Sequence, residues 1–216
     1  MKLLIIGATG QTGQELLKQA LAQGQVVSAY VRNPQKLPAD SRLTIYQGQL
    51  SEEDKLRQAM TGQDAVLLTL GNSFANRSQP FFEKVMPTII ASMKQAQVQR
   101  LISLSSLGVG LTLGNTRYPY RLGVQTFLRG NHRDHWLGEK ELGDSGLNWT
   151  TIHPSPLFNG EKTAHPSYHL AHTGYKVSGI ARTMRADVAA VMLEVLARPE
   201  TYQQALVMSS QEEGKR

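Results

Sequence analysis

Three glycines close to the start of the chain have a spacing suited to binding a phosphate. Gly7, Gly10 and Gly13 follow the apolar residues 3–6 in the stretch GATGQTG. A side chain at a strand-to-helix turn would block a phosphate, whereas glycine lets the backbone close around it. The alternative is an ordinary tight turn, but the place of these glycines after an apolar run and before a helical pattern favours a dinucleotide. Because no Gly-Lys-Ser/Thr sequence follows, the turn is not a phosphate-transfer loop.

The residue after the second apolar segment indicates which dinucleotide is bound. A carboxylate at this point would accept a hydrogen bond from the 2′-hydroxyl of the adenosine ribose, whereas an arginine would pair with a 2′-phosphate. In the stretch SAYVRNPQKL this residue is Arg32, and no carboxylate follows before Asp40. A solvated surface arginine is the alternative, and the pattern favours NADP over NAD.

Strands and helices must hold these residues in place, and the sequence supplies them in alternation. Apolar segments bounded by turn residues predict parallel strands at residues 2–6, 26–31, 43–47, 65–70, 100–105 and 148–152. Helical patterns predict helices over residues 11–23, from the candidate cap Ser51, after Pro80 with a kink or shift at Pro87, and over residues 131–143 and 185–197. This alternation predicts an α/β fold with a doubly wound, mostly parallel sheet of the Rossmann type, in a single domain of residues 1–216.

Composition indicates where the protein works and what it binds. The 216 residues include no cysteine, which excludes disulfides and thiolate metal sites and suits the reducing cytoplasm. The first apolar run is too short for a signal peptide or a membrane span, so we expect no membrane partner. The formal net charge is +6, but the basic residues are scattered singly. We therefore expect no nucleic-acid partner and favour a small phosphorylated ligand.

Six segments occur along the chain in a fixed order: GATGQTG, VRNPQKL, GQDAVLLTLG, LISLSSLG, ELGDSGLNWTTIHPSPL and ADVAAVMLEVL. This set resembles the atypical short-chain dehydrogenase/reductases, and it is most similar to their NADPH-dependent biliverdin-IXβ reductase and flavin reductase branch. The resemblance extends from about residue 2 to residue 209. It implies the following cofactor-binding residues: Gly7, Thr9, Gly10, Gln11, Thr12, Gly13, Arg32, Gln49, Leu50, Leu70, Gly71, Ser105, Lys140, His153, Pro154 and Ser155.

The catalytic residues differ from those of most short-chain dehydrogenases, which use a tyrosine followed four residues later by a lysine. Trp136 stands at the tyrosine position and Lys140 at the lysine position, while Ser106 matches the family's active-site serine. Tryptophan cannot exchange a proton at neutral pH, so we expect an acceptor that is already electrophilic and conjugated. Ser106 and Lys140 are the predicted catalytic residues. A turn cap is the alternative role for Ser106, and Ser105 is the other candidate serine.

Two irregular segments, residues 107–133 and 156–180, are the candidates for an acceptor pocket. The first combines arginines with aromatic rings, which suits a planar anion. The predicted substrate-binding residues are Ser106, Arg117, Tyr118, Arg121 and His135, with a solvated basic loop and a structural histidine as the alternatives. The second segment holds His165, His169 and His172 without a clear neighbouring carboxylate, so we predict no metal site.

Two classes of function fit these features. The favoured one is an NADPH-dependent reductase of a biliverdin or a flavin, with a quinone as the alternative acceptor, acting as a cytoplasmic monomer. The other is an NADP-sensing regulator that resembles the NmrA-like proteins and binds a protein partner. Retention of Ser106 and Lys140 favours the enzyme.

Overall fold

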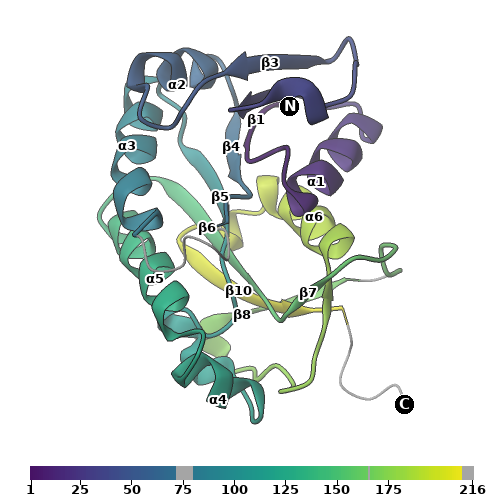
Figure 1. Ribbon diagram of the computed structural model, residues 1–216, viewed down its shortest axis with the longest axis vertical. Helices are drawn as coiled ribbons and strands as arrows, with labels where there is room; N and C mark the ends of the chain where they lie inside the picture. The colour runs from purple at the N-terminus through teal and green to yellow at the C-terminus, as the bar shows by residue number, and fades with distance from the viewer. Residues whose placement is uncertain (72–79, 165, 211–216) are drawn as a thin grey trace.

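An eight-stranded sheet forms the centre of the computed structural model, which describes residues 1–71, 80–164 and 166–210. The strand order is β3-β2-β1-β4-β5-β6-β10-β8, and only β10 and β8 pair in antiparallel fashion (Figure 1). The strands are β1 (Lys2–Ile6), β2 (Val26–Val31), β3 (Leu43–Gln47), β4 (Ala65–Leu68), β5 (Arg100–Leu104), β6 (Asn148–Pro154), β8 (Ser167–Leu170) and β10 (Gln204–Ser209). Two short strands, β7 (Leu157–Phe158) and β9 (Thr183–Met184), pair separately. The strand order reverses between β1 and β4, which is where open α/β sheets bind ligands.

Helices cover both faces of this sheet (Figure 1). On one face lie α1 (Gln11–Ala22) and α6 (Arg185–Glu194), and on the other lie α2 (Glu53–Met60), α3 (Phe82–Gln95) and α5 (Arg129–Gly143). The remaining helical segments are α4 (Tyr120–Gln125) and the 3₁₀ helices η1 (Pro34–Lys36), η3 (Gly110–Asn115), η4 (Ala171–Thr173), η5 (Val195–Ala197) and η6 (Pro199–Thr201). Within the described ranges, no helix is both long enough and apolar enough to cross a bilayer.

The first strand is buried on both faces, which explains its unbroken apolar sequence. Leu3 and Ile5 point into the core beneath α1 and α6, whereas Leu4 and Ile6 point into the core beneath α2 and α3. This alternation follows from the two-residue period of a strand. All four side chains are at most 1% exposed, so β1 is fixed in register at the centre of the sheet. The glycine turn follows directly at its carboxyl end.

The doubly wound, mostly parallel fold predicted from the sequence is confirmed, with shifts at the ends of elements. β4 ends two residues before the predicted boundary and β5 ends one before, whereas β6 runs on to Pro154. β10 was not predicted, because its short apolar run is recognisable as a strand only once it pairs with β6, far away in the sequence.

Two helix predictions were wrong in detail. α2 begins at Glu53 and Ser51 does not cap it, because the Glu52 carboxylate accepts a hydrogen bond of 2.7 Å from the N–H of Gln49 and keeps the chain in a turn. α3 continues through Pro87 as one helix. Pro87 lies on the exposed side of α3, where the carbonyl that loses its N–H partner can bind water.

Asp187, near the start of α6, fastens two distant segments beside the carboxyl edge of the sheet. Its fully buried carboxylate accepts a hydrogen bond of 2.7 Å from the N–H of Thr163 and another from the hydroxyl of Ser210. The Ser210 hydroxyl in turn accepts a hydrogen bond of 2.7 Å from the N–H of Met184. With the Thr163 hydroxyl, which also donates to it at 3.1 Å, this buried carboxylate accepts three hydrogen bonds. Its role is structural, and it holds the segments that follow β7 and β10.

Candidate functional site

The glycine turn connects the carboxyl end of β1 to α1. Gly7 has a φ angle of +95°, and a Cβ atom on it would lie 2.9 Å from the backbone of Thr69, so only glycine fits. A Cβ atom on Gly13 would lie 2.2 Å from the carbonyl oxygen of Gly7, which means that α1 packs directly on the turn. Gly10 is different, because a Cβ atom there would meet nothing closer than 3.3 Å and the residue faces a cavity.

The first turn of α1 is open to an anion. Gly10 is its N-cap, no side chain among the described residues caps it, and its first turn contains no acidic residue. The first N–H groups of a helix have no intrahelical partner, and the helix dipole adds positive potential there. Gly10, Gln11 and Thr12 line a cavity at this point. A diphosphate can therefore accept hydrogen bonds from the turn.

A cavity of about 430 Å³, here called the middle cavity, extends from this turn toward the end of β2. Its lining residues are Ile6, Gly7, Thr9, Tyr30, Val31, Arg32, Gly48, Gln49, Leu50, Ser51, Leu70, Gly71, Phe81 and Val85. The Tyr30 hydroxyl donates a hydrogen bond of 2.8 Å to the carbonyl of Gln49 and so holds the segment after β3 against the cavity. The predicted contacts Thr9, Gln49 and Leu50 all lie here.

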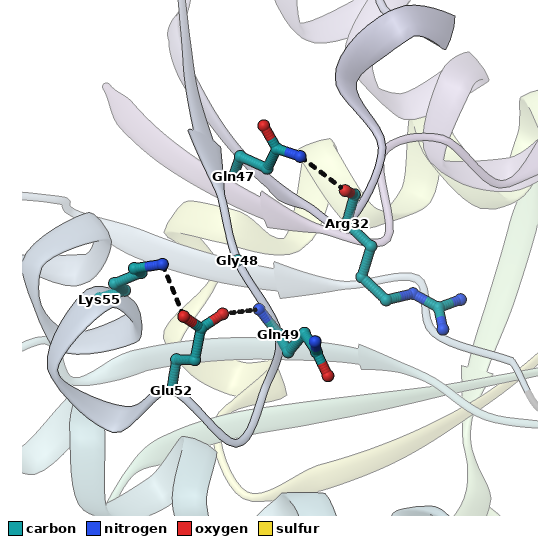
Figure 2. A pocket seen from close by; sticks show the side chains of 6 residues that line it. All are labelled: Arg32, Gln47, Gly48, Gln49, Glu52 and Lys55. Atoms are coloured by element: carbon teal, nitrogen blue, oxygen red, sulfur yellow. Dashed lines mark hydrogen bonds and ion pairs between the residues drawn. The ribbon is translucent and has the colours of Figure 1, made fainter.

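Figure 2 shows a second cavity, the Arg32 cavity of about 470 Å³, which is lined by Arg32, Gln47, Gly48, Gln49, Glu52 and Lys55. The Gln47 amide donates a hydrogen bond of 3.2 Å to the carbonyl of Arg32 and fixes its backbone. The Glu52 carboxylate lies between the Lys55 ammonium, at 2.6 Å, and the Gln49 N–H. These partners lower the pKa of Glu52 and neutralise its charge.

The Arg32 guanidinium is thereby left available to a ligand. Among the described residues, no carboxylate forms an ion pair with it, and in Figure 2 it extends away from Glu52. An arginine in this position can hold a phosphate through paired hydrogen bonds. Arg32 lines both the Arg32 cavity and the middle cavity, so the two are continuous.

The third cavity, the serine cavity of about 460 Å³, continues the cleft on the far side of the glycine turn. Its lining residues are Gly10, Gln11, Thr12, Thr69, Leu70, Gly71, Leu104, Ser105, Ser106, His135, Pro154, Ser155, Pro156, Leu157 and Arg185. Leu70 and Gly71 also line the middle cavity and join the two. The structure therefore brings most of the predicted site residues into one cleft along the carboxyl edge of the sheet.

A buried acid lies behind the serine cavity. The Ser105 hydroxyl donates a hydrogen bond to Oε1 of Glu139 on α5, whose side chain is 18% exposed. Burial raises the pKa of Glu139 to about 8, although the Ser105 hydrogen bond opposes this effect. The other carboxyl oxygen lies 3.9 Å from Nε2 of His153, and burial lowers the pKa of that imidazole to about 4. At neutral pH the carboxyl is therefore protonated and the imidazole is uncharged.

Two further groups define the wall of the serine cavity. The imidazole of His135 lies against the ring of Phe82, with centroids 3.8 Å apart and the planes tilted by 30°, and burial lowers its pKa to about 3. The Ser106 hydroxyl is hydrogen-bonded to Tyr120, whose pKa burial raises. The Tyr120 hydroxyl also lies 3.1 Å from the carbonyl of Leu107, to which it donates. Ser106 is thus held by Tyr120, and Ser105 by Glu139.

The structure does not bring Lys140 or the His153 side chain to the cleft. Lys140 is exposed, and its ammonium lies 5.1 Å from the centre of the Trp136 ring. Trp136 is 41% exposed and packs against Gly110. His153 is 1% exposed and points into the protein, where its ring nitrogens bond to the carbonyl of Ser106 and the hydroxyl of Thr151. The expected contacts of Lys140 and His153 with the nicotinamide end remain predictions, and in this structure both side chains point away from the cleft.

The predicted substrate arginines also lie outside the cleft. Arg117, Tyr118 and Arg121 are exposed, and they do not belong to the lining of the serine cavity. His169 stacks on Tyr175, with centroids 3.6 Å apart, and His172 bonds to Gln204 at 3.0 Å. His165 lies outside the described residues. Among the residues that the structure describes, no cluster of three or more histidines and carboxylates could hold a metal ion.

Two residues at the cleft, Glu139 and Arg185, were not predicted from the sequence. Glu139 shares one face of α5 with the buried His132 and His135, at helical spacings of seven and four. A carboxylate on a buried helical face is a signal that the sequence does contain. Arg185 begins α6, lines the serine cavity and donates a hydrogen bond of 2.8 Å to Asn159. No sequence signal distinguishes it from other arginines.

The chain is similar in sequence to a known protein family and to individual proteins. The model of a family described as NAD(P)H-binding matches residues 7–199. An uncharacterized chloroplastic protein of Arabidopsis thaliana is 27% identical over 93% of this chain and 73% of its own length. Uncharacterized protein YwnB of Bacillus subtilis is 24% identical, over 99% of this chain and all of its own.

Solved structures share the fold over nearly the whole chain. A short-chain dehydrogenase/reductase from Veillonella parvula, in complex with NADP, has a TM-score of 0.82 at 18% identity and covers 99% of this chain and 95% of its own. ChuY from Escherichia coli O157:H7, described as an anaerobilin reductase, has a TM-score of 0.78 at 21% identity, with complete coverage of both chains.

Proposed function

The chain belongs to the NAD(P)H-binding family, and from this premise we propose that it is an NADPH-dependent reductase that transfers a hydride to a conjugated acceptor. The acceptor class is a biliverdin or a flavin. The observation that carries the proposal is the continuous cleft in which the Arg32, middle and serine cavities join end to end. A dinucleotide needs an adenosine site, a diphosphate turn and a nicotinamide site in that order.

The residues of the cleft fit NADPH. The uncapped turn at Gly10 offers backbone N–H groups to the diphosphate. Arg32, which has no carboxylate partner among the described residues, suits the 2′-phosphate. No atom of the described residues lies within 4 Å of the Cβ position of Gly71, so these residues leave room where the middle and serine cavities meet.

NADPH bound in this way supplies a hydride at the nicotinamide end of the cleft. The residues of the chain then hold the acceptor and exclude water. The uncharged His135, backed by the buried ring of Phe82, lines the cavity, and Arg185 adds a cation to the same lining. A flat, conjugated acceptor with an anionic substituent suits such a site. The similarity in fold to an anaerobilin reductase supports an acceptor of the tetrapyrrole kind.

The direct test measures NADPH oxidation with purified protein while FMN, a biliverdin and a quinone are supplied in turn, with NADPH binding measured separately by calorimetry. Turnover with FMN or biliverdin supports the proposal. Turnover with the quinone alone would show that the acceptor is a quinone and not a biliverdin or a flavin. Tight NADPH binding without turnover of any acceptor would favour an NADP-sensing regulator instead.

We further propose that the protein acts as a monomer in the cytoplasm. A chain of 216 residues without cysteine is well suited to a reducing compartment. Light scattering coupled to size-exclusion chromatography tests the oligomeric state, and a mass twice that of the chain would overturn it. Fractionation of cells that produce the protein tests its location.

A further inference from the structure

Ser105 and Glu139 form a hydrogen-bonded pair that connects the serine cavity to the protein interior. Ser105 follows β5 and lines the cavity, while Glu139 reaches it from α5, 34 residues later. The N–H of Ser105 donates a hydrogen bond of 2.8 Å to the carbonyl of Ile152, so its position is fixed by the sheet. The Ser105 side chain can rotate about χ1, so its hydroxyl can exchange a hydrogen-bond partner while the backbone stays in place.

The surroundings keep the Glu139 carboxyl neutral. The titratable side chains near the pair, among the described residues, include His153 on β6, His132 and His135 on α5, and Tyr120 beyond Ser106. Arg185 at the start of α6 is the cation in the lining of the same cavity. Burial lowers the pKa of all three imidazoles, so none of them supplies a positive charge at neutral pH. His153 is fixed as a donor from Nδ1 to the carbonyl of Ser106, which leaves its Nε2 to accept from Thr151.

Resting on the reductase function proposed above, we propose that the Ser105 hydroxyl gives the acceptor its proton and that Glu139 replaces this proton. Ser105 is then a catalytic residue, and Glu139 acts through it as a positioning residue and proton source. The Ser105–Glu139 pair supplies the proton donor that is missing at the tyrosine position. Trp136 stands at that position, and it lies outside the cavity against Gly110.

The step balances in atoms and charge. The acceptor gains two electrons and a hydrogen as the hydride of NADPH, and a heteroatom of the acceptor forms a bond to the Ser105 proton. The Ser105 O–H bond breaks as the Glu139 proton moves to its oxygen. Glu139 becomes a carboxylate and takes a proton from water, so the net reaction consumes NADPH, acceptor and one proton.

Ser106 and Tyr120 form the competing pair. Burial raises the pKa of Tyr120, and its hydroxyl already donates to the carbonyl of Leu107. Among the described residues, the partners of Tyr120 are a hydroxyl and a carbonyl, neither of which is an acid able to replace a donated proton, whereas the partner of Ser105 is the Glu139 carboxyl. The geometry therefore favours Ser105, whose partner is an acid that is protonated at neutral pH and poised to ionise near it.

The first experiment is independent of catalysis. Infrared difference spectra between wild type and Glu139→Gln, recorded across a pH series, should show the carbonyl stretch of a protonated carboxylic acid at neutral pH, lost with a midpoint near pH 8. Glu141→Gln, on the exposed side of α5, is the matched control and should leave this band in place. An ionised Glu139 at neutral pH would overturn the proton-source role while leaving the reductase proposal intact.

The second experiment follows turnover with FMN or biliverdin. Ser105→Ala should lower kcat by about 100-fold or more with the NADPH dissociation constant within twofold of wild type. Glu139→Gln should lower kcat and abolish the fall in kcat above pH 8, and Glu139→Asp should restore part of both. Tyr120→Phe should keep the pH dependence of the wild type.

The outcomes separate the two proposals. If Tyr120→Phe removes the pH dependence and Ser105→Ala does not, Ser106 and Tyr120 deliver the proton and the present assignment is wrong. If no acceptor is reduced although NADPH binds, the reductase proposal fails and this inference fails with it, whatever the infrared spectra show.

Discussion

Phe81 and Asp134 lie 53 residues apart, yet the N–H of Phe81 donates a hydrogen bond of 2.8 Å to the Asp134 carboxylate. Asp134 is 6% exposed on α5, and it also accepts from the N–H groups of Phe82 and Glu83. Phe81 is the N-cap of α3 and has no side-chain acceptor of its own. A carboxylate from a neighbouring helix therefore performs the capping, and it fixes Phe82 beneath His135 in the wall of the serine cavity.

Replacing Asp134 with alanine should destabilise the fold and disturb the cleft. Three backbone N–H groups would lose their acceptor, and the free energy of unfolding should fall by about 2–3 kcal/mol. Asp134→Asn should lose less, since its amide oxygen can still accept. Urea unfolding of both variants measures the difference. Replacing the exposed Glu83 with alanine is the control, and equal losses in all three variants would contradict this account.

Arg32→Ala should weaken NADPH far more than NADH. The loss of a charge-assisted pair with the 2′-phosphate should cost about 1.5–3 kcal/mol, or roughly tenfold to a hundredfold in affinity. Calorimetric titration of both nucleotides gives the comparison. Lys18→Ala removes the same charge from the exposed side of α1 and should leave the preference for NADPH unchanged. Equal weakening of both nucleotides by Arg32→Ala would mean that the 2′-phosphate binds elsewhere.

Gly10→Val should lose NADPH binding, whereas Gly13→Val should lose stability. A side chain on Gly10 enters the serine cavity with its Cβ 3.3 Å from the nearest atom, so the protein should fold without binding NADPH. A Cβ on Gly13 would lie 2.2 Å from the carbonyl of Gly7, so that variant should lose stability. Circular dichroism and calorimetry separate the two effects. If Gly10→Val bound NADPH with the affinity of the wild type, the diphosphate would have to bind away from this turn.

Lys140→Ala should leave NADPH affinity and turnover close to those of the wild type. The ammonium lies over the exposed Trp136 ring, an interaction worth about 0.5–1 kcal/mol at such a site. Trp136→Phe should also retain activity, because the ring packs against Gly110 outside the serine cavity. Steady-state rates and NADPH affinities check both. A large loss of NADPH affinity in Lys140→Ala would mean that Lys140 turns inward when the nucleotide binds.

The sequence predicts the cofactor half of the cleft well because that half is built from local signals. The glycine turn, Arg32 and the strand pattern lie within about forty residues, and their physical roles depend mainly on adjoining elements. The family match confirms the fold and the binding of a nicotinamide dinucleotide. The individual contact residues remain predictions.

The acceptor half depends on contacts between distant segments, which spacing alone does not reveal. The Tyr-to-Lys spacing pointed to Lys140, but the rotation of α5 places Glu139 inward and Lys140 outward. His153 was expected at the nicotinamide end, yet its ring is buried against the carbonyl of Ser106 and the hydroxyl of Thr112, which lie far from it in the sequence. Arg185 reaches the cavity only because α6 packs beside α1.

Stability should be greatest near pH 6.5 and should fall toward pH 8. The folded protein holds the Glu139 proton up to about pH 8, whereas the ordinary pKa of this group is 4.5. Between these two pH values the folded state binds more protons than the unfolded state does. The free energy of unfolding therefore falls by about 1.4 kcal/mol for each pH unit. The depressed pKa values of His135 and His153 act in the opposite sense: their contribution is present above pH 6.5 and is lost as the pH falls toward 4. Below pH 6.5 the two histidines outweigh Glu139, and above pH 6.5 the loss from Glu139 exceeds what the histidines still add.

Urea unfolding at a series of pH values tests this balance. Wild type should lose about 1 kcal/mol between pH 6.5 and pH 8, while Glu139→Gln should show no loss there and keep the acid-side loss caused by the histidines. Glu141→Gln should behave like wild type, because its side chain lies on the exposed side of α5. A wild-type profile that is flat or rising from pH 6.5 to pH 8 would show that Glu139 is already ionised in the folded protein, and the acid behind Ser105 would then have to be found in another residue.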